Sequence, residues 1–351
     1  MSESTSNETV VLDGRQGEGG GQVLRTSLSL AAALGRPVVV ENVRGGRRKP
    51  GLLRQHRTAL RAVRDITAGE VEGDELGSTS VRFTPGGPPL GGKYRFGIGS
   101  AGSTMLVLQT VLPPLLRAHE PSTVVLEGGT HNPSAPPFEF LDEAFLPCVR
   151  AMGAEATARL VRPGYFPGGG GELMVEVAPA AERRRLKLLA REDAGTPSVE
   201  VVVDGLPADI AEREWKAFRR KLHWTRDRLR VSEAKAGRSP GNVMIARFPQ
   251  SVHAAVLVSF GMRERSSEAV GGDLARQVRE YVSSDAPVDE HLADQLMLPM
   301  TLMGGGSFRC TTLSRHATTN AEVIDAFLPG AVRFEADGPN GEQRVVVSPQ
   351  P

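Results

Sequence analysis

A histidine near the C-terminal end is the side chain best suited to covalent chemistry. His316 follows a predicted strand at 307–313 and opens the next helix, beside Thr318, Thr319 and Asn320. A histidine at a sheet edge, near a helix N-terminus, can present a neutral nitrogen to a phosphorus atom and form a covalent phosphoramidate. A capping or packing role is the competing interpretation of a single histidine.

A glycine-rich segment near the N-terminus has the character of an anion-binding loop. Residues 17–22 read GEGGGQ, follow a predicted strand at 9–13 and open a helix at 22–34. Glycines let backbone amides approach a ligand, and a helix N-terminus attracts anions. Glu18 is unfavourable beside a bare phosphate, so we interpret it as a ligand for a divalent cation that bridges to phosphates. A flexible turn is the alternative.

Three further polar segments lie between predicted elements. Residues 44–51 read RGGRRKPG, and their arginine forks suit phosphate, although a solvated charge run fits equally well. Residues 128–137 read GGTHNPSAPP, a rigid turn that could cap a helix. Residues 289–295 read DEHLADQ, where Asp294 and Gln295 could contact a ribose and a base edge, or where acids simply suit the helix dipole.

A repeat of about 80 residues organises the elements that carry these segments. Apolar spacing predicts two helices and four strands in a first unit that ends near 84, and a matching second unit from 94 to 177. A third unit contains helices at 268–283, 291–303 and 318–327. The block at 186–265 breaks the repeat, and its charged helix at 208–222 has the pattern of a solvated face.

Bulk composition excludes several classes of protein. The 351 residues carry a net charge of +1, so an RNA partner must be held by local arginine clusters rather than by a generally basic surface. Two distant cysteines make a disulfide framework or a cysteine zinc site unfavourable. The polar segment 1–9 is unlike a secretory signal, and the apolar stretch 105–116 is too short to span a bilayer. We expect a cytoplasmic protein with no membrane contact.

Six segments, taken in order between residues 12 and 320, resemble the RNA 3′-terminal phosphate cyclase family. They are LDGRQGEGGGQVLRTSLSL, RKPGLLRQH, GSAGSTMLVLQTVLPPLL, GGTHNPSAPP, HLADQLMLPM and RHATTN. Several of these segments are long and unusual, so the resemblance is specific, and it covers nearly the whole chain.

The resemblance implies a mixed α+β and α/β fold. A large catalytic domain at 1–185 and 266–351 would contain three repeated units, each with two helices against a four-stranded sheet. Such units resemble the C-terminal domain of translation initiation factor three and the halves of enolpyruvylshikimate phosphate synthase. A small α/β domain at 186–265 would be inserted before the third unit.

The resemblance also implies a ligase-type reaction with ATP and an RNA that ends in a 3′-phosphate. A histidine takes AMP from ATP and releases pyrophosphate, AMP passes to the RNA phosphate, and the neighbouring 2′-hydroxyl closes a 2′,3′-cyclic phosphate. The family's functional residues fall on His316 as nucleophile and Glu18 as ligand of Mg²⁺ or Mn²⁺. Its ATP site falls on Gln109, Pro136, His291, Leu292, Ala293, Asp294 and Gln295, and its RNA-phosphate site on Arg25, Arg44, Arg47 and Gln55.

One position departs from the family pattern. His291 stands where the bacterial pattern has a tyrosine that stacks on adenine, and a histidine ring stacks with less area, so we expect weaker ATP affinity or base selectivity than is typical of the family. Three other functions compete: a non-catalytic relative that acts in ribosome assembly and lacks the histidine, an enolpyruvyl transferase, and a plain RNA-binding protein that uses the 44–49 cluster. The sequence leaves open whether the chain forms a homo-oligomer.

Overall fold

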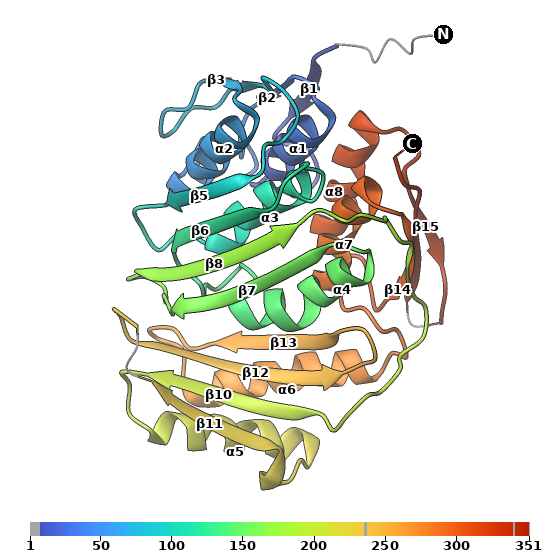
Figure 1. Cartoon of the computed structure of the whole chain (residues 1–351). Coiled ribbons are helices and arrows are strands. Elements are labelled where there is room, and N and C mark those ends of the chain that lie inside the picture. The colour runs from blue at the N-terminus through green and yellow to red at the C-terminus, as the bar shows by residue number, and fades with distance from the viewer. Residues whose placement is uncertain (1–7, 235–236, 340, 351) are drawn as a thin grey trace.

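The computed structural model describes residues 8–234, 237–339 and 341–350, so almost all of the polar segment at 1–9 lies outside it. The described backbone forms four-stranded sheets with helices packed between them (Figure 1). No helix in these ranges combines the length and apolar character needed to cross a bilayer.

The first unit has the strand order β1-β2-β4-β3, with β1 parallel to β2 and the other pairs antiparallel. The helix α1 matches its predicted range, and it ends where Gly35 takes a left-handed conformation, which glycine adopts without strain. The elements are β1 (Val10–Asp13), α1 (Gln22–Leu34), β2 (Val38–Glu41), α2 (Arg54–Thr67), β3 (Glu70–Glu72) and β4 (Val81–Thr84).

The second unit repeats this order as β5-β6-β8-β7. The second helical segment of this unit includes a π-helix, η1, that continues directly into α4, and its hydrogen-bond spacing is changed next to Pro147, which lacks an N–H to donate. The elements are β5 (Gly92–Gly97), α3 (Thr104–Leu115), β6 (Ser122–Gly128), η1 (Phe140–Phe145), α4 (Leu146–Ala151), β7 (Glu155–Arg162) and β8 (Gly171–Ala178).

The third unit has the same order once its first strand is recognised, β9-β14-β16-β15. The strand β9 pairs parallel with β14, as β1 does with β2 in the first unit. The elements are β9 (Leu186–Leu188), α7 (Glu290–Leu302), β14 (Gly306–Cys310), α8 (Arg315–Phe327), β15 (Val332–Ala336) and β16 (Gln343–Val347). The three-unit architecture predicted from the repeat is therefore confirmed.

The insertion forms the fourth sheet, with the order β11-β10-β12-β13, and carries two helices on one face (Figure 1). Its elements are β10 (Ser198–Asp204), α5 (Asp209–Leu222), the short η2 (Arg226–Arg228), β11 (Leu229–Ala234), β12 (Gly241–Pro249), β13 (Ala254–Phe260) and α6 (Ser267–Val282).

Strand pairing and packing move both predicted boundaries of the insertion, 186 and 265, by one element. The strand β9 lies inside the predicted insertion but pairs in the sheet of the third unit. The helix α6, predicted for the third unit, packs against α5, and its Val270 and Leu274 share a core with Trp215. Apolar spacing predicts that a helix buries one face, but it does not tell against which partner.

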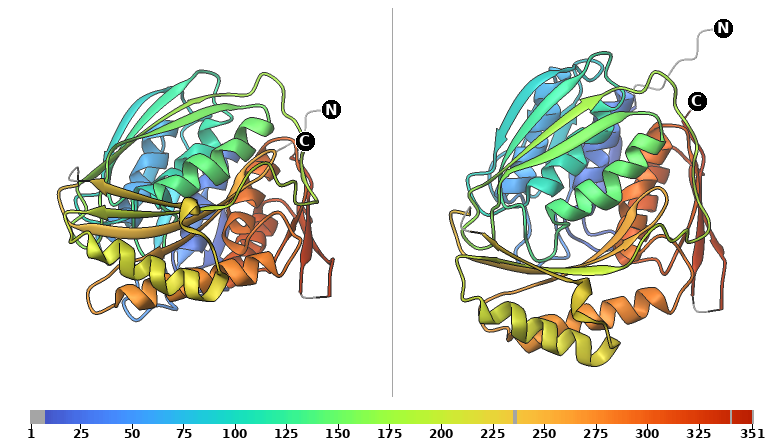
Figure 2. Two further views of the ribbon diagram at one scale, coloured as in Figure 1. Left: turned by 90° about the horizontal axis from the view of Figure 1, so that it is seen from below. Right: turned by 60° about the horizontal axis from the view of Figure 1, so that its bottom comes forward.

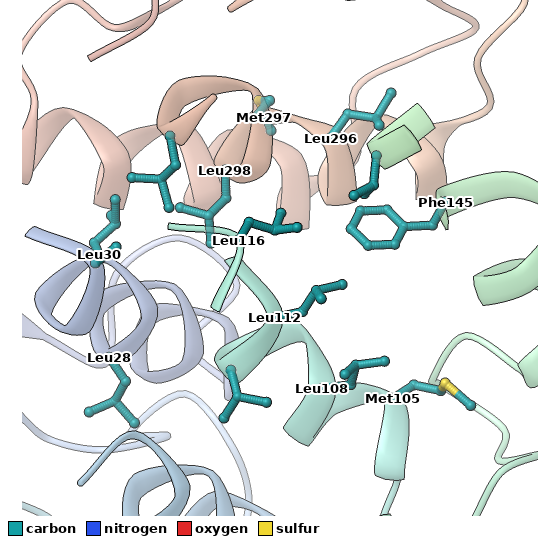
Figure 3. Close-up of a cluster of buried hydrophobic side chains, with 14 of the residues drawn as sticks. Leu28, Leu30, Met105, Leu108, Leu112, Leu116, Phe145, Leu296, Met297 and Leu298 are labelled. Atoms are coloured by element: carbon teal, nitrogen blue, oxygen red, sulfur yellow. The ribbon is translucent and has the colours of Figure 1, made fainter. Parts of the chain in front are cut away.

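The helices of the three units meet in the middle of the molecule, and their sheets lie outside (Figure 2). Figure 3 shows where α1, α3 and α7 come together, with Leu28, Leu112 and Leu298 among the labelled side chains of this buried cluster. Full burial of each such side chain contributes about 1.5–3 kcal/mol. Because this core fixes the three helices, it also fixes the loops at their N-terminal ends.

Candidate active site

The glycine loop before α1 packs directly against α8. A Cβ at Gly17 would lie 1.8 Å from Oγ1 of Thr319, and one at Gly19 would lie 2.8 Å from Cα of Gly46. Both glycines have positive φ, of 56° and 62°, which side chains rarely tolerate. The absence of side chains at these positions therefore lets the loop reach the first turn of α8 and the arginine loop together.

Glu18 is held in this loop as an ionised carboxylate. Its Oε1 accepts the backbone N–H of Gln22 at 3.1 Å, and its Oε2 pairs with Arg47. Burial opposes ionisation, but the Gln22 hydrogen bond and the positive charges of His316, Arg47 and Arg25 outweigh it and lower the pKa of Glu18. The carboxylate is thus a fixed negative charge at the start of α1.

His316 lies in the first turn of α8, and its side chain is exposed. Ser314 begins this helix, since its side chain accepts the backbone N–H of Ala317 at 3.1 Å. The imidazole is close enough to contribute to the lowered pKa of Glu18 and to oppose the rise that burial causes in the pKa of Asp294. The structure therefore brings His316 and Asp294, from the C-terminal part of the chain, close to Glu18 near its N-terminus.

The start of α7 presents only some of its predicted residues to this region. Asp289 begins the helix and accepts the backbone N–H groups of His291 at 2.8 Å and Leu292 at 3.1 Å. The side chains of Leu292 and Ala293 are fully buried in the hydrophobic core. At these two positions only the backbone remains to contact a nucleotide.

Asp294 and Gln295 form the polar end of this turn. Asp294 is buried, and burial raises its pKa, against the opposing positive charges of His316 and Arg25. Gln295 is partly exposed, and its Nε2 donates to Oδ2 of Asp294 at 2.8 Å. Asp294 is consequently a buried acceptor, and Gln295 is the member of the pair that reaches open space.

An apolar pocket opens between α3, η1 and α7. Three of the predicted ATP-site residues, Gln109, Pro136 and Gln295, line it together with Asn320, and Figure 3 shows several of its apolar wall residues. The wall is formed by Met105, Leu108, Leu112, Pro113, Phe140, Leu141, Phe145, Leu298 and Pro299. An apolar pocket with a few convergent amides suits a planar base.

His291 lines a different hollow from this pocket. The exposed imidazole borders a polar groove between the insertion and the third unit, together with Glu280, Tyr281 and Glu290. Pro136, another of the predicted ATP-site residues, lines the apolar pocket instead. The structure thus places His291 at the other side of the α7 N-terminus from the residues predicted to share its ligand.

Arg25 lies beneath the glycine loop with an exposure of 7%. Its Nε donates to Oε1 of Gln109 at 2.9 Å, which joins α1 to α3. Burial lowers the pKa of Arg25, and the negative charges of Asp294 and Glu18 counter this effect. The predicted phosphate-binding arginine and the predicted ATP-site glutamine are therefore in direct contact.

The other three predicted phosphate ligands differ in the contacts that hold their side chains. Arg47 is exposed, and its side chain pairs with Glu18. Arg44 donates from Nη1 to the backbone carbonyls of Lys49 at 2.8 Å and Gly51 at 2.9 Å, so it braces its own loop. Gln55 accepts the backbone N–H of Ser103 at 2.9 Å and thereby fixes the start of α3.

His56 is a residue of this region that the sequence placed on a packing face of its helix. It is buried, and burial with the charges of Arg25 and Arg44 lowers its pKa to about 3. Its Nδ1 accepts the backbone N–H of Leu53 at 3.3 Å, so the proton of the neutral ring lies on Nε2. That nitrogen would lie 2.6 Å from a Cβ at Gly21, so the ring faces the glycine loop.

Gln22, Thr319 and Asn320 are three further polar residues that the site predictions left out. Each of the three side chains is 1% exposed or less. Their only indication in the sequence is that polar side chains interrupt helix faces next to the GEGGGQ and RHATTN segments. A buried polar side chain in such a place requires a partner.

The described residues contain no group of three or more His, Cys, Asp or Glu side chains placed to hold a metal ion. Glu18 alone is consistent with a Mg²⁺ or Mn²⁺ ion that takes one carboxylate from the protein and its remaining ligands from water and substrate phosphates. The donor set therefore fits a cation carried in with a nucleotide, and not a closed structural site.

Comparison with known proteins identifies the family of the chain. The sequence model of the family described as RNA 3′-terminal phosphate cyclase matches residues 16–334. The RNA 3′-terminal phosphate cyclase of Salmonella paratyphi C (strain RKS4594) is 43% identical over 97% of this chain and 97% of its own length. That of Ralstonia nicotianae (strain ATCC BAA-1114 / GMI1000) is also 43% identical, over 97% of each chain.

One solved structure aligns with much lower similarity. The enolpyruvyl transferase NikO from Streptomyces tendae covers 97% of this chain and 48% of its own, at 12% identity and a TM-score of 0.39. A TM-score this low does not establish a shared fold. Family membership rests instead on the sequence match, which spans the glycine loop, the α7 turn and the histidine of α8: the chain belongs to the RNA 3′-terminal phosphate cyclase family of enzymes.

Proposed function

We propose that this enzyme uses ATP to convert an RNA 3′-phosphate end into a 2′,3′-cyclic phosphodiester and releases AMP and pyrophosphate. The observation that supports this most is the position of His316, exposed at the start of α8 and within electrostatic reach of both Glu18 and Asp294. An accessible imidazole near an acidic glycine loop and the buried carboxyl group of Asp294 is suited to nucleotidyl transfer.

The nucleotide binds with its base toward the pocket between α3 and α7. Gln109, Pro136 and Gln295 contact the base there, because they line the same hollow. Asp294 orients the side chain of Gln295 by accepting its 2.8 Å hydrogen bond. The triphosphate then extends toward the glycine loop, where backbone amides at the start of α1 attract anions.

In the first step, a ring nitrogen of His316 attacks the α-phosphorus of ATP. The bond from this phosphorus to the bridging oxygen breaks, and pyrophosphate leaves with the electron pair. A bound Mg²⁺ or Mn²⁺, held by Glu18 and the phosphates, would offset the charge of this leaving group. Arg47 lies next to Glu18 and adds a second positive charge at the same place.

In the second step, an oxygen of the RNA 3′-phosphate attacks the phosphorus of the histidine-bound AMP, and the P–N bond returns its electron pair to the ring. Arg25 and Arg47 hold the RNA phosphate, and Arg44 and Gln55 keep the surrounding loops in place. The 2′-oxygen then attacks the RNA phosphorus, AMP leaves, and the hydroxyl proton passes to solvent. The adjacent hydroxyl makes ring closure effectively intramolecular.

The decisive experiment follows the label from ATP. Protein incubated with a divalent metal and ATP labelled at the α-phosphate should retain acid-labile label, whereas γ-labelled ATP should leave none. His316→Ala should abolish the label, and His119→Ala, at another exposed histidine beyond the end of α3, should not. A wild-type protein that takes up no α-label would refute the covalent step.

Substrate choice is tested with RNAs that differ only at the end. An oligoribonucleotide with a 3′-phosphate should be cyclised, and the same RNA with a 3′-hydroxyl should not. A matched DNA 3′-phosphate should not cyclise, because it has no 2′-hydroxyl. A cytoplasmic location is part of the proposal, since both cysteines are free and buried, as in proteins of reducing compartments.

A further inference from the structure

A single buried amide joins the predicted RNA side of the site to the predicted nucleotide side. Gln22 of α1 is 1% exposed. Its Oε1 accepts Nη2 of Arg25 at 2.6 Å, and its Nε2 donates to Oδ1 of Asp294 at 3.3 Å and to Oγ1 of Thr26 at 3.2 Å. An amide can do both because it is an acceptor at one end and a donor at the other.

The contacts around Asp294 fix the direction of this amide. Oδ2 of Asp294 accepts Nε2 of Gln295, and its backbone carbonyl accepts Nδ2 of Asn320 at 2.7 Å. Oδ1 of Asn320 in turn accepts the hydroxyl of Thr26 at 2.7 Å. The hydrogen bonds therefore close a ring through α1, α7 and α8 in which the amide of Gln22 has one satisfactory orientation.

Charge explains why the bridging residue is neutral. Arg25 donates to two amides, those of Gln22 and Gln109, while Asp294 and Glu18 act on it as countercharges. A carboxylate in place of the Gln22 amide would face the carboxylate of Asp294. An apolar side chain would leave buried donors and acceptors unsatisfied on both sides.

We infer that Gln22 is a positioning residue, whose amide relays the placement of Asp294 on the nucleotide side to Arg25 on the RNA-phosphate side. The relay rests on the proposed function, because it presumes that Arg25 meets the RNA phosphate. It turns Nη1 of Arg25 toward Gly21, where a Cβ would lie 2.5 Å from that nitrogen. The relay thus aims the free end of the guanidinium at the glycine loop.

Two substitutions at this position test the relay. Gln22→Met keeps the length of the side chain and removes both its donor and its acceptor, so the KM for 3′-phosphate RNA should rise at least tenfold. Labelling of His316 by α-labelled ATP should change less than threefold. Fluorescence anisotropy with a labelled oligoribonucleotide ending in 3′-phosphate gives a binding readout that needs no turnover, and it should show the same loss.

An exchange of the two side-chain types distinguishes positioning from mere destabilisation. Gln22→Glu alone should be at least as damaging as Gln22→Met. In the double variant Gln22→Glu/Asp294→Asn, the carboxylate at position 22 accepts a hydrogen bond from Arg25 and another from the amide at position 294. The total charge is the same as in the wild type. The double variant should recover most of the RNA affinity. Failure to recover in a protein with wild-type Tm overturns the relay.

The control lies on the same helix. Ser29 is buried, and its hydroxyl has no hydrogen-bond partner among the described residues, so Ser29→Ala should leave both readouts unchanged. If Gln22→Met binds RNA as the wild type does, or loses labelling and RNA affinity equally, the relay is wrong. A wild-type protein that processes no RNA end would instead count against the proposed function.

Discussion

Oγ1 of Thr319, one turn after His316 in α8, accepts the backbone N–H of Glu18 at 2.9 Å. The same hydroxyl donates to the carbonyl of Arg315 at 2.7 Å, so it is held in place by its own helix. Through this contact the loop with the acidic residue and the helix with the histidine are fixed to each other.

Removing that hydroxyl should therefore slow the first chemical step. Thr319→Val keeps the shape of the side chain and deletes a hydrogen bond worth ~1 kcal/mol, so the labelling rate with α-labelled ATP should fall roughly five- to tenfold. The matched control is Thr318→Val, whose hydroxyl donates only within the helix, to Arg315 at 3.2 Å. Equal rates for the two variants would contradict the anchoring role of Thr319.

A methyl group at Gly17 should disturb the same contact from the loop side. Gly17→Ala would place Cβ against Thr319 and would also strain a backbone with φ of 56°. Gly35→Ala supplies the backbone strain alone, since nothing lies within 4 Å of its Cβ position. Gly35→Ala should lose roughly 1 kcal/mol of stability in denaturant titrations, and Gly17→Ala should lose more, because the clash adds to the strain. Labelling should fall in Gly17→Ala only.

Arg47 should affect the RNA steps more than the ATP step. Arg47 is exposed and pairs with Glu18. A phosphate can therefore replace Glu18 as the partner of Arg47, and a cation can replace Arg47 as the partner of Glu18. Arg47→Ala should lower RNA end processing at least tenfold and should lower the metal concentration needed for half-maximal labelling, because Glu18 loses its competitor. Parallel rate measurements of labelling and cyclisation check this, and an equal loss in both would count against the assignment.

His291 provides a test of nucleotide selectivity. If the ring contacts the base, His291→Tyr should increase the affinity for ATP and the preference for ATP over GTP, because a larger ring stacks over more area. The two nucleotides are compared as adenylate and guanylate donors in the labelling assay. The structure places His291 in the polar groove instead, so an unchanged preference would indicate that the base binds only against Pro136 and Gln295.

The insertion contains a carboxyl group that should make stability depend on pH. Glu214 is fully buried, with Oε2 accepting Nδ2 of Asn242 at 3.2 Å, and burial raises its pKa from 4.5 to about 7. Between these values the unfolded chain releases the proton that the folded chain keeps, so stability falls as the pH rises from 4.5 to about 7 and this loss is complete above that pH. Glu214→Gln should raise stability at pH 8 by up to about 3 kcal/mol and change it little at pH 4.

Thermal unfolding at the two pH values measures this difference. Glu268→Gln is a suitable control on the neighbouring helix, because its carboxylate is exposed and pairs with Arg213 at the surface. A stability gain in Glu214→Gln that is the same at pH 4 and pH 8 would show that packing, and not the proton, is responsible.

The elements of the repeated units could be predicted because their side chains carry local patterns. The helix α1 was predicted with its observed range, since apolar residues recur on one face and glycine follows its end. The strand β9 has only three residues, and no local pattern assigns it to a sheet 120 residues farther along. The partner of α6 was likewise hidden, because apolar spacing shows that a helix buries one face but not against which element.

The candidate site shows the same division. The motif segments predicted that Gln109, Pro136 and Gln295 share a ligand, and all three line one pocket. The roles of Gln22 and Thr319 depend on partners 272 and 301 residues away, which a single sequence does not reveal. The burial of Leu292 and Ala293 was equally invisible, because a motif gives residue types but not the directions of their side chains.

The parallel pairing of β9 with β14 has a consequence for synthesis of the chain on the ribosome. Leu186–Leu188 emerges long before its partner Gly306–Cys310, and the whole insertion must emerge in between. The first two units can close their sheets during translation, whereas the last sheet waits until nearly all residues have left the exit tunnel. The helix that bears His316 follows β14, so a nascent chain that stalls earlier holds the acidic loop but no nucleophile.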